Sequence, residues 1–163
     1  MARGGTPAIV ALNDAGVSFQ VHEFEADPAE RHYGPAAALA LGVELERVFK
    51  TLIATVDDHN HVVAIVPVNG QLSLKELAAA VHGKRAEMCL PETAQRLTGY
   101  VVGGISPFGQ KRSLPTVIDE TCVLFDSIFV SGGRRGLDIE IAAADLVAVL
   151  DAVIAPIGTP RTV

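Results

Sequence analysis

A chain of 163 residues, 49% of them apolar, is long and apolar enough to bury the core of one domain, which excludes an intrinsically disordered chain. Its formal net charge of −6 at pH 7 argues against a protein that coats nucleic acid non-specifically. A local basic patch stays open as an alternative to solvated loops, and its candidate cations are Arg31, Lys50, Lys84, Arg85, Lys111, Arg112, Arg134 and Arg135.

Local signals mark where two of the helices begin. Thr6 and Pro7 suit the N-cap and the first position of a helix, and Gly16 suits its end. Ser73 and Glu76 stand three residues apart, as in a capping box. We therefore expect helices directly after Thr6 and directly after Ser73.

The other elements follow from hydrophobic periodicity and turn residues. In chain order, the expected elements are a helix over 7–15, a strand over 17–25, a turn at Asp27-Pro28, a helix over 35–41, strands over 47–56 and 61–68, a helix over 74–81, a strand over 86–89, a helix over 91–97, strands over 100–102, 116–119, 127–130 and 137–141, a helix over 143–154 and a loose tail over 156–163. Strands outnumber helices without regular alternation, which argues against a doubly wound nucleotide-binding fold. The expected fold class is α+β: one domain over residues 1–163, its core from about 6 to 157, with a curved, barrel-like mixed sheet surrounded by helices.

Cysteine usage and hydropathy bear on location. Cys89 and Cys122 are isolated, without the spacing of a metal or redox site. Neither has a basic neighbour in the sequence that would favour its thiolate, so we expect neither to be a nucleophile. The sequence shows no signal-peptide apolar region and no apolar run of about 20 residues that could span a bilayer. We therefore expect a cytoplasmic protein.

Two motifs that suggest other chemistry fail on inspection. The segment 104–111 resembles a phosphate-binding P-loop, but Gln110 separates the second glycine from Lys111, where that motif needs them adjacent. His59 and His61 lie two apart in an expected turn, with no third ligand in the pattern. We therefore expect no nucleotide binding of the P-loop kind, no metal site and no cofactor.

Three segments dominate the region from Thr98 to Asp138: two glycine-bearing stretches, 103–112 and 130–136, and the short acidic strand 137–140. Paired glycines beside serine and cationic side chains offer backbone N–H donors that suit the ester, ribose or phosphate oxygens of a small ligand. The alternative that these are ordinary loops between strands stays open.

Lys50 interrupts an apolar strand run. A buried ammonium is costly unless it is paired, so either this face of the strand is wet or the cation points into a pocket. Phe49 and Thr51 should face one side of the strand, while Val48 and Leu52 share the side of Lys50. This apolar surrounding favours an ammonium that emerges within a sheltered pocket.

Several segments in a fixed order carry a family resemblance. They are Val21–Glu25, Asp27-Pro28, Val48–Leu52, Thr98–Pro107, Leu114–Asp119, Val130–Gly133 and Gly136–Glu140. Together they resemble the YbaK/EbsC family, within the superfamily of prolyl-tRNA synthetase editing domains. The resemblance runs from about Thr6 to Ile157 and is closest to the YbaK type, the free-standing Cys-tRNA(Pro) deacylases.

The resemblance implies a barrel-like sheet with a pocket between sheet and helices, and a trans-editing activity. Prolyl-tRNA synthetase cannot fully exclude cysteine, which is similar in size to proline, so a second protein removes cysteine from Cys-tRNA(Pro). In this family picture the substrate thiol attacks its own ester carbonyl and leaves as a thiolactone, while the protein supplies positioning and electrostatics. The implied partners are Cys-tRNA(Pro) and prolyl-tRNA synthetase, with no membrane.

The resemblance also implies the site residues. Lys50 is the implied catalytic residue, and the implied substrate-binding residues are Phe24, Thr51, Gly103, Gly104, Ile105, Ser106, Ser131, Gly132 and Asp138. Phe24 departs from the tyrosine that many YbaK-type members carry, so a role of that hydroxyl in orienting substrate does not carry over. Two alternatives stay open: an Ala-tRNA(Pro) deacylase of the same superfamily, and a non-catalytic module that binds aminoacyl-tRNA or the synthetase.

Overall fold

The computed structural model describes residues 5–27, 29–30 and 32–160. Pro28 of the expected turn, Arg31 of the candidate cations and residues 161–163 of the expected tail lie outside the described residues. The helices are α1 (Pro7–Ala15), α2 (Tyr33–Leu41), α3 (Leu74–Ala80), α4 (Pro91–Thr98) and α5 (Ala143–Leu150), with two 3₁₀ turns, η1 (Leu45–Arg47) and η2 (Glu120–Leu124). The strands are β1 (Phe19–Glu23), β2 (Phe49–Val56), β3 (Asn60–Pro67), β4 (Gly70–Leu72), β5 (Ala86–Met88), β6 (Thr116–Asp119), β7 (Ser127–Arg134), β8 (Leu137–Ala142), β9 (Val153–Ala155) and β10 (Gly158–Pro160).

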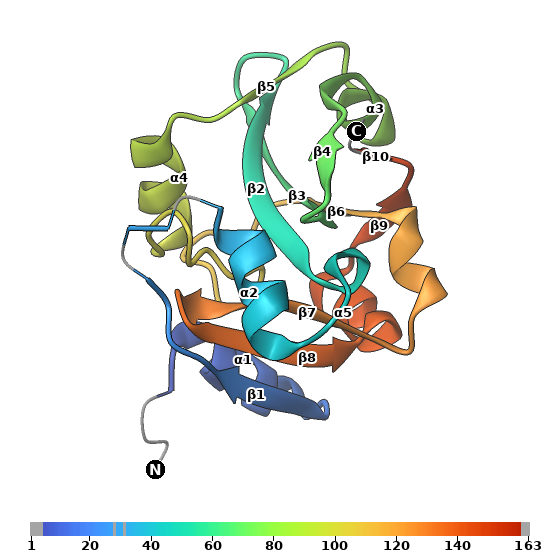
Figure 1. Ribbon diagram of the computed structural model, residues 1–163. Coiled ribbons are helices and arrows are strands. Elements are labelled where there is room, and N and C mark those ends of the chain that lie inside the picture. The colour runs from blue at the N-terminus through green and yellow to red at the C-terminus, as the bar shows by residue number, and fades with distance from the viewer. Residues whose placement is uncertain (1–4, 28, 31, 161–163) are drawn as a thin grey trace.

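The strands form three sheets (Figure 1). The largest is mixed, with the order β5-β2-β3-β6-β9, and the second is antiparallel, with the order β1-β8-β7. The third pairs β4 with β10. A parallel bridge between Val48 and Phe129 joins the first two sheets just before β2 begins. The α+β class is confirmed, but the large sheet is not a closed barrel, because β5 and β9 end it as edge strands.

Helix boundaries follow the predicted signals closely. The Thr6 side chain accepts a hydrogen bond from the backbone N–H of Ile9 at the start of α1, and Gly16 ends that helix with a φ of 73°. The Ser73 hydroxyl accepts a hydrogen bond from the backbone N–H of Glu76 at 3.2 Å and caps α3. These ends depend on residues close in sequence, so sequence reasoning finds them.

Three predicted elements are wrong, and one of them is the loose tail over 156–163, in which residues 158–160 form β10 and pair with β4. Residues 100–102 form a turn and not a strand, because a hydrogen bond from the N–H of Gly104 to the Val101 carbonyl folds the chain back. The last helix ends at Leu150 and does not reach 154, because Asp151 takes a left-handed φ of 50°. Residues 153–155 instead form β9, which pairs with β6 in parallel.

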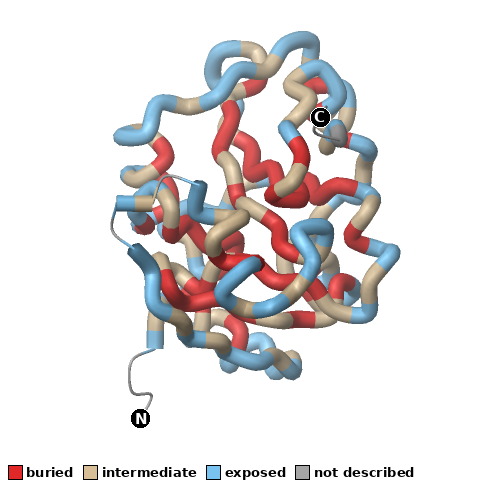
Figure 2. Tube along the Cα trace, in the orientation of Figure 1, coloured by how far each residue is buried: buried red, intermediate tan, exposed pale blue. Residues whose placement is uncertain are grey.

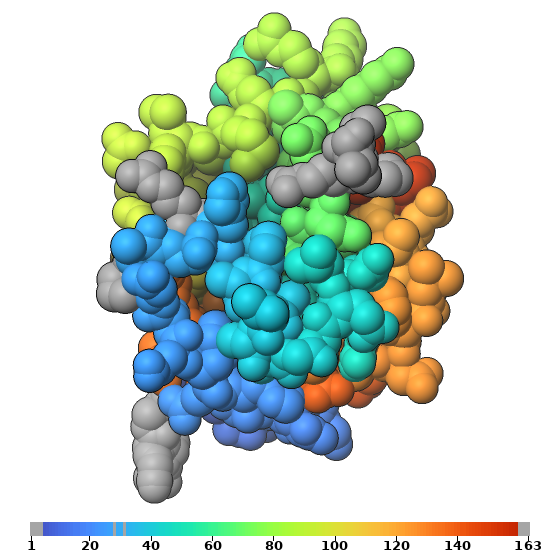
Figure 3. Space-filling view, in the orientation of Figure 1, coloured from blue at the N-terminus to red at the C-terminus, as the bar shows by residue number. Residues whose placement is uncertain are grey.

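The buried residues follow the sheets and the helices packed on them (Figure 2). Side chains of β2 alternate between two apolar clusters: Phe49 and Ile53 belong to one with Val63 and Ile65, whereas Ala54 and Val56 belong to another. In the space-filling view, the segment from α2 to η1 covers the front of β2 (Figure 3). None of the described helices is long and apolar enough to cross a membrane.

The start of α1 holds both glycine-bearing segments in place. The Thr6 hydroxyl donates a hydrogen bond to the Gly132 carbonyl in β7. Gly109 approaches Pro7 so closely that a Cβ there would lie 2.3 Å from the Pro7 carbonyl oxygen. Two loops far apart in sequence are thus fixed against one helix end, and this fixes one side of the site described next.

Candidate functional site

A cavity of about 420 Å³ opens along one edge of β2. Within the described residues, β5 pairs with β2 at Ala54–Val56, so the edge of β2 over residues 49–53 faces the cavity instead of another strand. Helix α2 and the two residues Gly103 and Ile105 supply further walls. A strand edge that carries no neighbouring strand leaves room for a ligand between the sheet and the helices, as the family resemblance implies.

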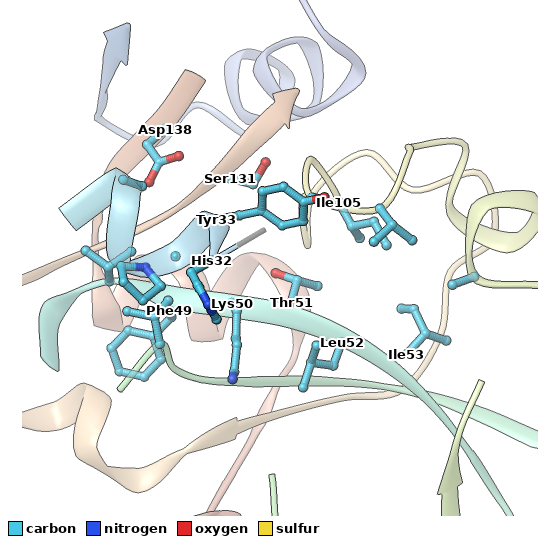
Figure 4. A pocket seen from close by; sticks show the side chains of 18 of the residues that line it. His32, Tyr33, Phe49, Lys50, Thr51, Leu52, Ile53, Ile105, Ser131 and Asp138 are labelled. Atoms are coloured by element: carbon cyan, nitrogen blue, oxygen red, sulfur yellow. The ribbon is translucent and has the colours of Figure 1, made fainter. Parts of the chain in front are cut away.

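The two predicted β2 residues lie on opposite faces of the strand (Figure 4). Thr51 points to the side of Ser131 and Tyr33, whereas the side chain of Lys50 extends to the other side. The Lys50 ammonium donates a hydrogen bond to the Gly70 carbonyl at 3.0 Å. Both residues line the cavity, which therefore reaches around the edge of β2.

Ser131 and Asp138 form the polar end of the cavity. They come from β7 and β8 and stand directly opposite each other in the register of that antiparallel pair. Asp138 is 7% exposed, and burial raises the pKa of its carboxyl to about 7. The Ser131 hydroxyl accepts a hydrogen bond from the N–H of Gly133 at 3.1 Å, which leaves its proton available to a ligand.

The segment after α4 contributes Gly103 and Ile105 to the cavity wall. Gly103 has a φ of 92°, and a Cβ there would lie 3.0 Å from the Tyr33 ring, so glycine is required for both conformation and space. The Tyr100 hydroxyl donates a hydrogen bond to the Phe108 carbonyl at 2.6 Å and so links the two ends of this segment. Burial raises the pKa of that hydroxyl to about 12, so it stays a donor.

Three predicted residues line neither this cavity nor the smaller one beside it: Gly104, Ser106 and Gly132. A Cβ on Gly104 would lie 2.8 Å from Arg134 Cα, and one on Gly132 would lie 3.0 Å from the Leu137 side chain. Ser106 is fully buried and accepts a hydrogen bond from the N–H of Phe108. In this structure these residues pack the loops that position the site.

Phe24 lies in a smaller adjoining cavity of about 150 Å³. The two cavities share Tyr33, Ala37, Gly103 and Asp138, so the cavity of Phe24 adjoins the polar end of the larger one. The Arg135 guanidinium lies over the Tyr33 ring, 4.2 Å from its centroid, and the Arg135 side chain also donates hydrogen bonds to the carbonyls of Asp27 and Glu30. These contacts hold Asp27 and Glu30 in the wall of the smaller cavity.

Among the lining residues that sequence reasoning did not select, His32, Tyr33 and Cys89 carry side chains that could contact a ligand through a polar atom or a thiol. His32 and Tyr33 begin α2, and no residue pattern marked them. Cys89 was set aside because it has no basic neighbour in sequence, yet its sulfur lies 3.6 Å from His61 Nδ1. The register of β2, β3 and β5 creates that contact. Among the described residues, no three His, Cys, Asp or Glu side chains are grouped so that they could hold a metal ion.

The family model described as the aminoacyl-tRNA editing domain matches residues 30–149. A protein of Enterococcus faecalis described as a candidate Cys-tRNA(Pro)/Cys-tRNA(Cys) deacylase, EbsC, is 37% identical over 138 residues, which is 84% of each chain. An Escherichia coli K12 protein named multifunctional Ser/Thr-tRNA deacylase ProXp-y is 30% identical over 154 residues, 89% of each chain.

The fold is similar to a crystal structure described as that of a candidate trans-editing enzyme for prolyl tRNA synthetase. The TM-score is 0.84 at 24% identity, and the similarity covers 98% of this chain and 99% of the other. The matched segment 30–149 contains the residues that line the 420 Å³ cavity.

Proposed function

This chain belongs to the aminoacyl-tRNA editing domain family, and from that membership we propose that it is a trans-editing deacylase that cleaves the aminoacyl ester of mischarged tRNA. One observation carries the proposal. The residues that match the family model, 30–149, include every residue that lines the 420 Å³ cavity, which is of a size for a substrate. Its proposed location is the cytoplasm, where aminoacyl-tRNA is made and used.

The preferred substrate in this proposal is Cys-tRNA(Pro), which the relative from Enterococcus faecalis supports by its description. Ser131 and Asp138 would receive the α-amino group and the terminal ribose at the polar end, and Thr51 and Ile105 would flank the side chain. The substrate thiol would attack its own ester carbonyl. The protein then needs no nucleophile of its own, and it acts by orientation and by stabilising the charge that develops on the carbonyl oxygen.

Lys50 is the proposed electrostatic group. Its ammonium lies on the far side of β2 from Ser131, in a hydrogen bond with the Gly70 carbonyl. A lysine side chain is long and flexible, so a bound tRNA end can draw the charge from this carbonyl to one of its phosphate or ester oxygens. Specificity for tRNA(Pro) would come from prolyl-tRNA synthetase as a partner.

A turnover assay tests the proposal. Catalytic amounts of the protein are incubated separately with Cys-tRNA(Pro), Ala-tRNA(Pro), Ser-tRNA and Thr-tRNA, and loss of each ester is followed over time. We expect many turnovers on Cys-tRNA(Pro). If Ala-tRNA(Pro) turns over faster, or if the Ser and Thr esters that the Escherichia coli relative is named for do so, that ester becomes the proposed substrate in place of Cys-tRNA(Pro). Binding without turnover of any ester would leave a non-catalytic module and overturn the deacylase.

A further inference from the structure

Cys89 combines a half-buried sulfur with two polar neighbours. It directly follows β5, and its backbone N–H donates a hydrogen bond to the Ile53 carbonyl at 3.1 Å. The sulfur lies 3.2 Å from Thr55 Oγ1 and 3.6 Å from His61 Nδ1. Thr55 and His61 are direct partners in the β2–β3 register, so the rigid part of the sheet fixes both beside the sulfur.

This arrangement favours thiolate chemistry. The thiolate is the reactive form of cysteine, and an imidazole nitrogen within contact distance can accept the thiol proton. Cys122 is the contrast within the same chain. It is fully buried, and burial together with the nearby Asp119 charge raises the pKa of its thiol to about 11. The fold thus places one of its two thiols beside an imidazole and a hydroxyl, and buries the other where it stays protonated.

Cys89 borders a space with room for a reagent. Cys89 lines the 420 Å³ cavity beside Ile53. On the same face of β2, two positions from Ile53, Thr51 Oγ1 is the one buried side-chain oxygen or nitrogen of the described residues that has no hydrogen-bond partner. Thr51 is more than nine-tenths buried and lines the same cavity. An unsatisfied hydroxyl in the same cavity favours a ligand that brings a polar group of its own.

We propose that Cys89 is a thiol-modification site that reacts with small disulfides of amino-acid size, such as cystine. His61 accepts the Cys89 proton, and the Cys89 sulfur attacks one sulfur of the disulfide. A new S–S bond to Cys89 forms while the old one breaks. The departing cysteine takes the proton, so Cys89 is oxidised and the leaving half of cystine is reduced. The cysteinyl group left on Cys89 occupies the cavity and blocks the deacylase, and this last step rests on the proposed function.

The first test measures the adduct alone and so does not depend on the proposed function. The folded full chain is incubated with cystine, and intact mass and peptide mapping follow the product. We expect one cysteinyl group per chain, on Cys89, removable by dithiothreitol, with Cys122 unmodified. The His61→Gln variant should react about tenfold more slowly than the parent. The matched control His59→Gln removes an exposed imidazole two residues away and should react at the parental rate.

The second test measures deacylation of the same samples. The ratio of treated to untreated rate should fall about tenfold for the parent and recover with dithiothreitol, whereas it should stay near one for Cys89→Ser.

Equal reactivity of Cys89 and Cys122, or equal rates in His61→Gln and His59→Gln, would overturn the modification site. An adduct with an unchanged rate ratio would overturn the block of the cavity. If the adduct forms but the untreated protein cleaves no ester, the proposed deacylase function is wrong and the modification site at Cys89 is still supported.

Discussion

Asp138 is a carboxylic acid held where water hardly reaches it. Burial raises the pKa of its carboxyl from 3.8 to about 7, so the folded protein binds this proton more tightly than the unfolded chain does. Stability is therefore lost as pH rises from about 4 to about 7, where the unfolded chain has released the proton and the folded protein must either retain it or bury a charge.

The first prediction is that Asp138→Asn removes this cost. The stability of the variant relative to the parent should rise between pH 4 and pH 7 by up to about 4 kcal/mol and stay level above pH 7. Urea unfolding of both proteins at several pH values measures it. Asp14→Asn, at an exposed position of α1, is the control and should show no such rise. A difference between parent and Asp138→Asn that does not change with pH would mean that Asp138 is ionised in the folded protein.

The second prediction concerns Lys50. In a site shielded from water, a cation that offsets developing charge contributes about 3 kcal/mol, so folded Lys50→Ala should lose deacylation by on the order of a hundredfold or more. Lys50→Arg should recover little, because a planar guanidinium does not replace a compact ammonium. Single-turnover deacylation of Cys-tRNA(Pro) measures both variants, with circular dichroism to confirm folding. If folded Lys50→Ala cleaves the ester at the parental rate, Lys50 has no role in catalysis and belongs to a solvated face of the strand.

At the scale of elements, the segment between α4 and β6 takes its shape from hydrogen bonds within the loop. It has no regular strand or helix, yet it supplies Gly103 and Ile105 to the cavity. Besides the bond from Gly104 to the Val101 carbonyl, the Tyr100 hydroxyl donates to the Phe108 carbonyl, the Phe108 N–H donates to the Ser106 hydroxyl, and the Gln110 side chain donates to the Ser106 carbonyl. The cavity wall is thus as stable as these buried polar contacts.

The third prediction follows from that dependence. Tyr100→Phe keeps the ring but leaves the buried Phe108 carbonyl without this donor, which should cost about 1–3 kcal/mol of stability. Thermal or urea unfolding measures it. Tyr33→Phe is the matched control, because it removes the hydroxyl of an exposed tyrosine and should change stability by less than about 0.5 kcal/mol. Equal effects of the two variants would contradict a structural role for the Tyr100 hydroxyl.

Elements set by neighbouring residues could be predicted, and elements set by distant partners could not. Thr6, Gly16 and Ser73 act within a few residues, so α1 and α3 were predicted almost to the residue. β10 was missed, because its pairing with β4 joins Thr159 to Gln71 across the chain and the expected tail shows no strand pattern. The sequence predicts helix where β9 begins, because a short apolar run fits either structure until its neighbour is known.

The residues of the site likewise fall into those that could be predicted and those that depend on distant partners. The family resemblance led to Lys50, Ser131 and Asp138, and all three line one cavity. It did not distinguish residues that line the cavity from those that pack behind it, such as Gly132, because sequence position does not reveal which side of a loop faces inward. The contact between Cys89 and His61 requires the pairing of three strands, so no local pattern could have indicated it.

At the scale of the whole molecule, size and charge limit how tRNA can be held. A chain of 163 residues with a net charge of −6 can offer a few phosphate contacts near its cavity, and it is too small to reach from the acceptor end of a tRNA to the anticodon. Affinity for tRNA should therefore come from a handful of cations and from the aminoacyl group itself.

The fourth prediction is that the isolated protein binds tRNA weakly, with an affinity that falls as salt is raised and that hardly distinguishes tRNA(Pro) from other tRNAs. Titration of several tRNAs at two or more salt concentrations measures this. Adding prolyl-tRNA synthetase should restore preference for tRNA(Pro) in the deacylation assay. Tight, salt-insensitive and tRNA(Pro)-specific binding by the protein alone would contradict the need for a partner.

The pairing of β1 with β8 also has a consequence for synthesis. His22 and Glu140 lie side by side in the finished sheet, but they are 118 residues apart in the chain. At ordinary translation speeds, β1 leaves the ribosome roughly 10 s before its partner strand. During that interval the N-terminal strand has no sheet to join, so the first strand to be made is among the last to be paired. We expect nascent chains that stop before β8 to leave β1 open to proteases and chaperones.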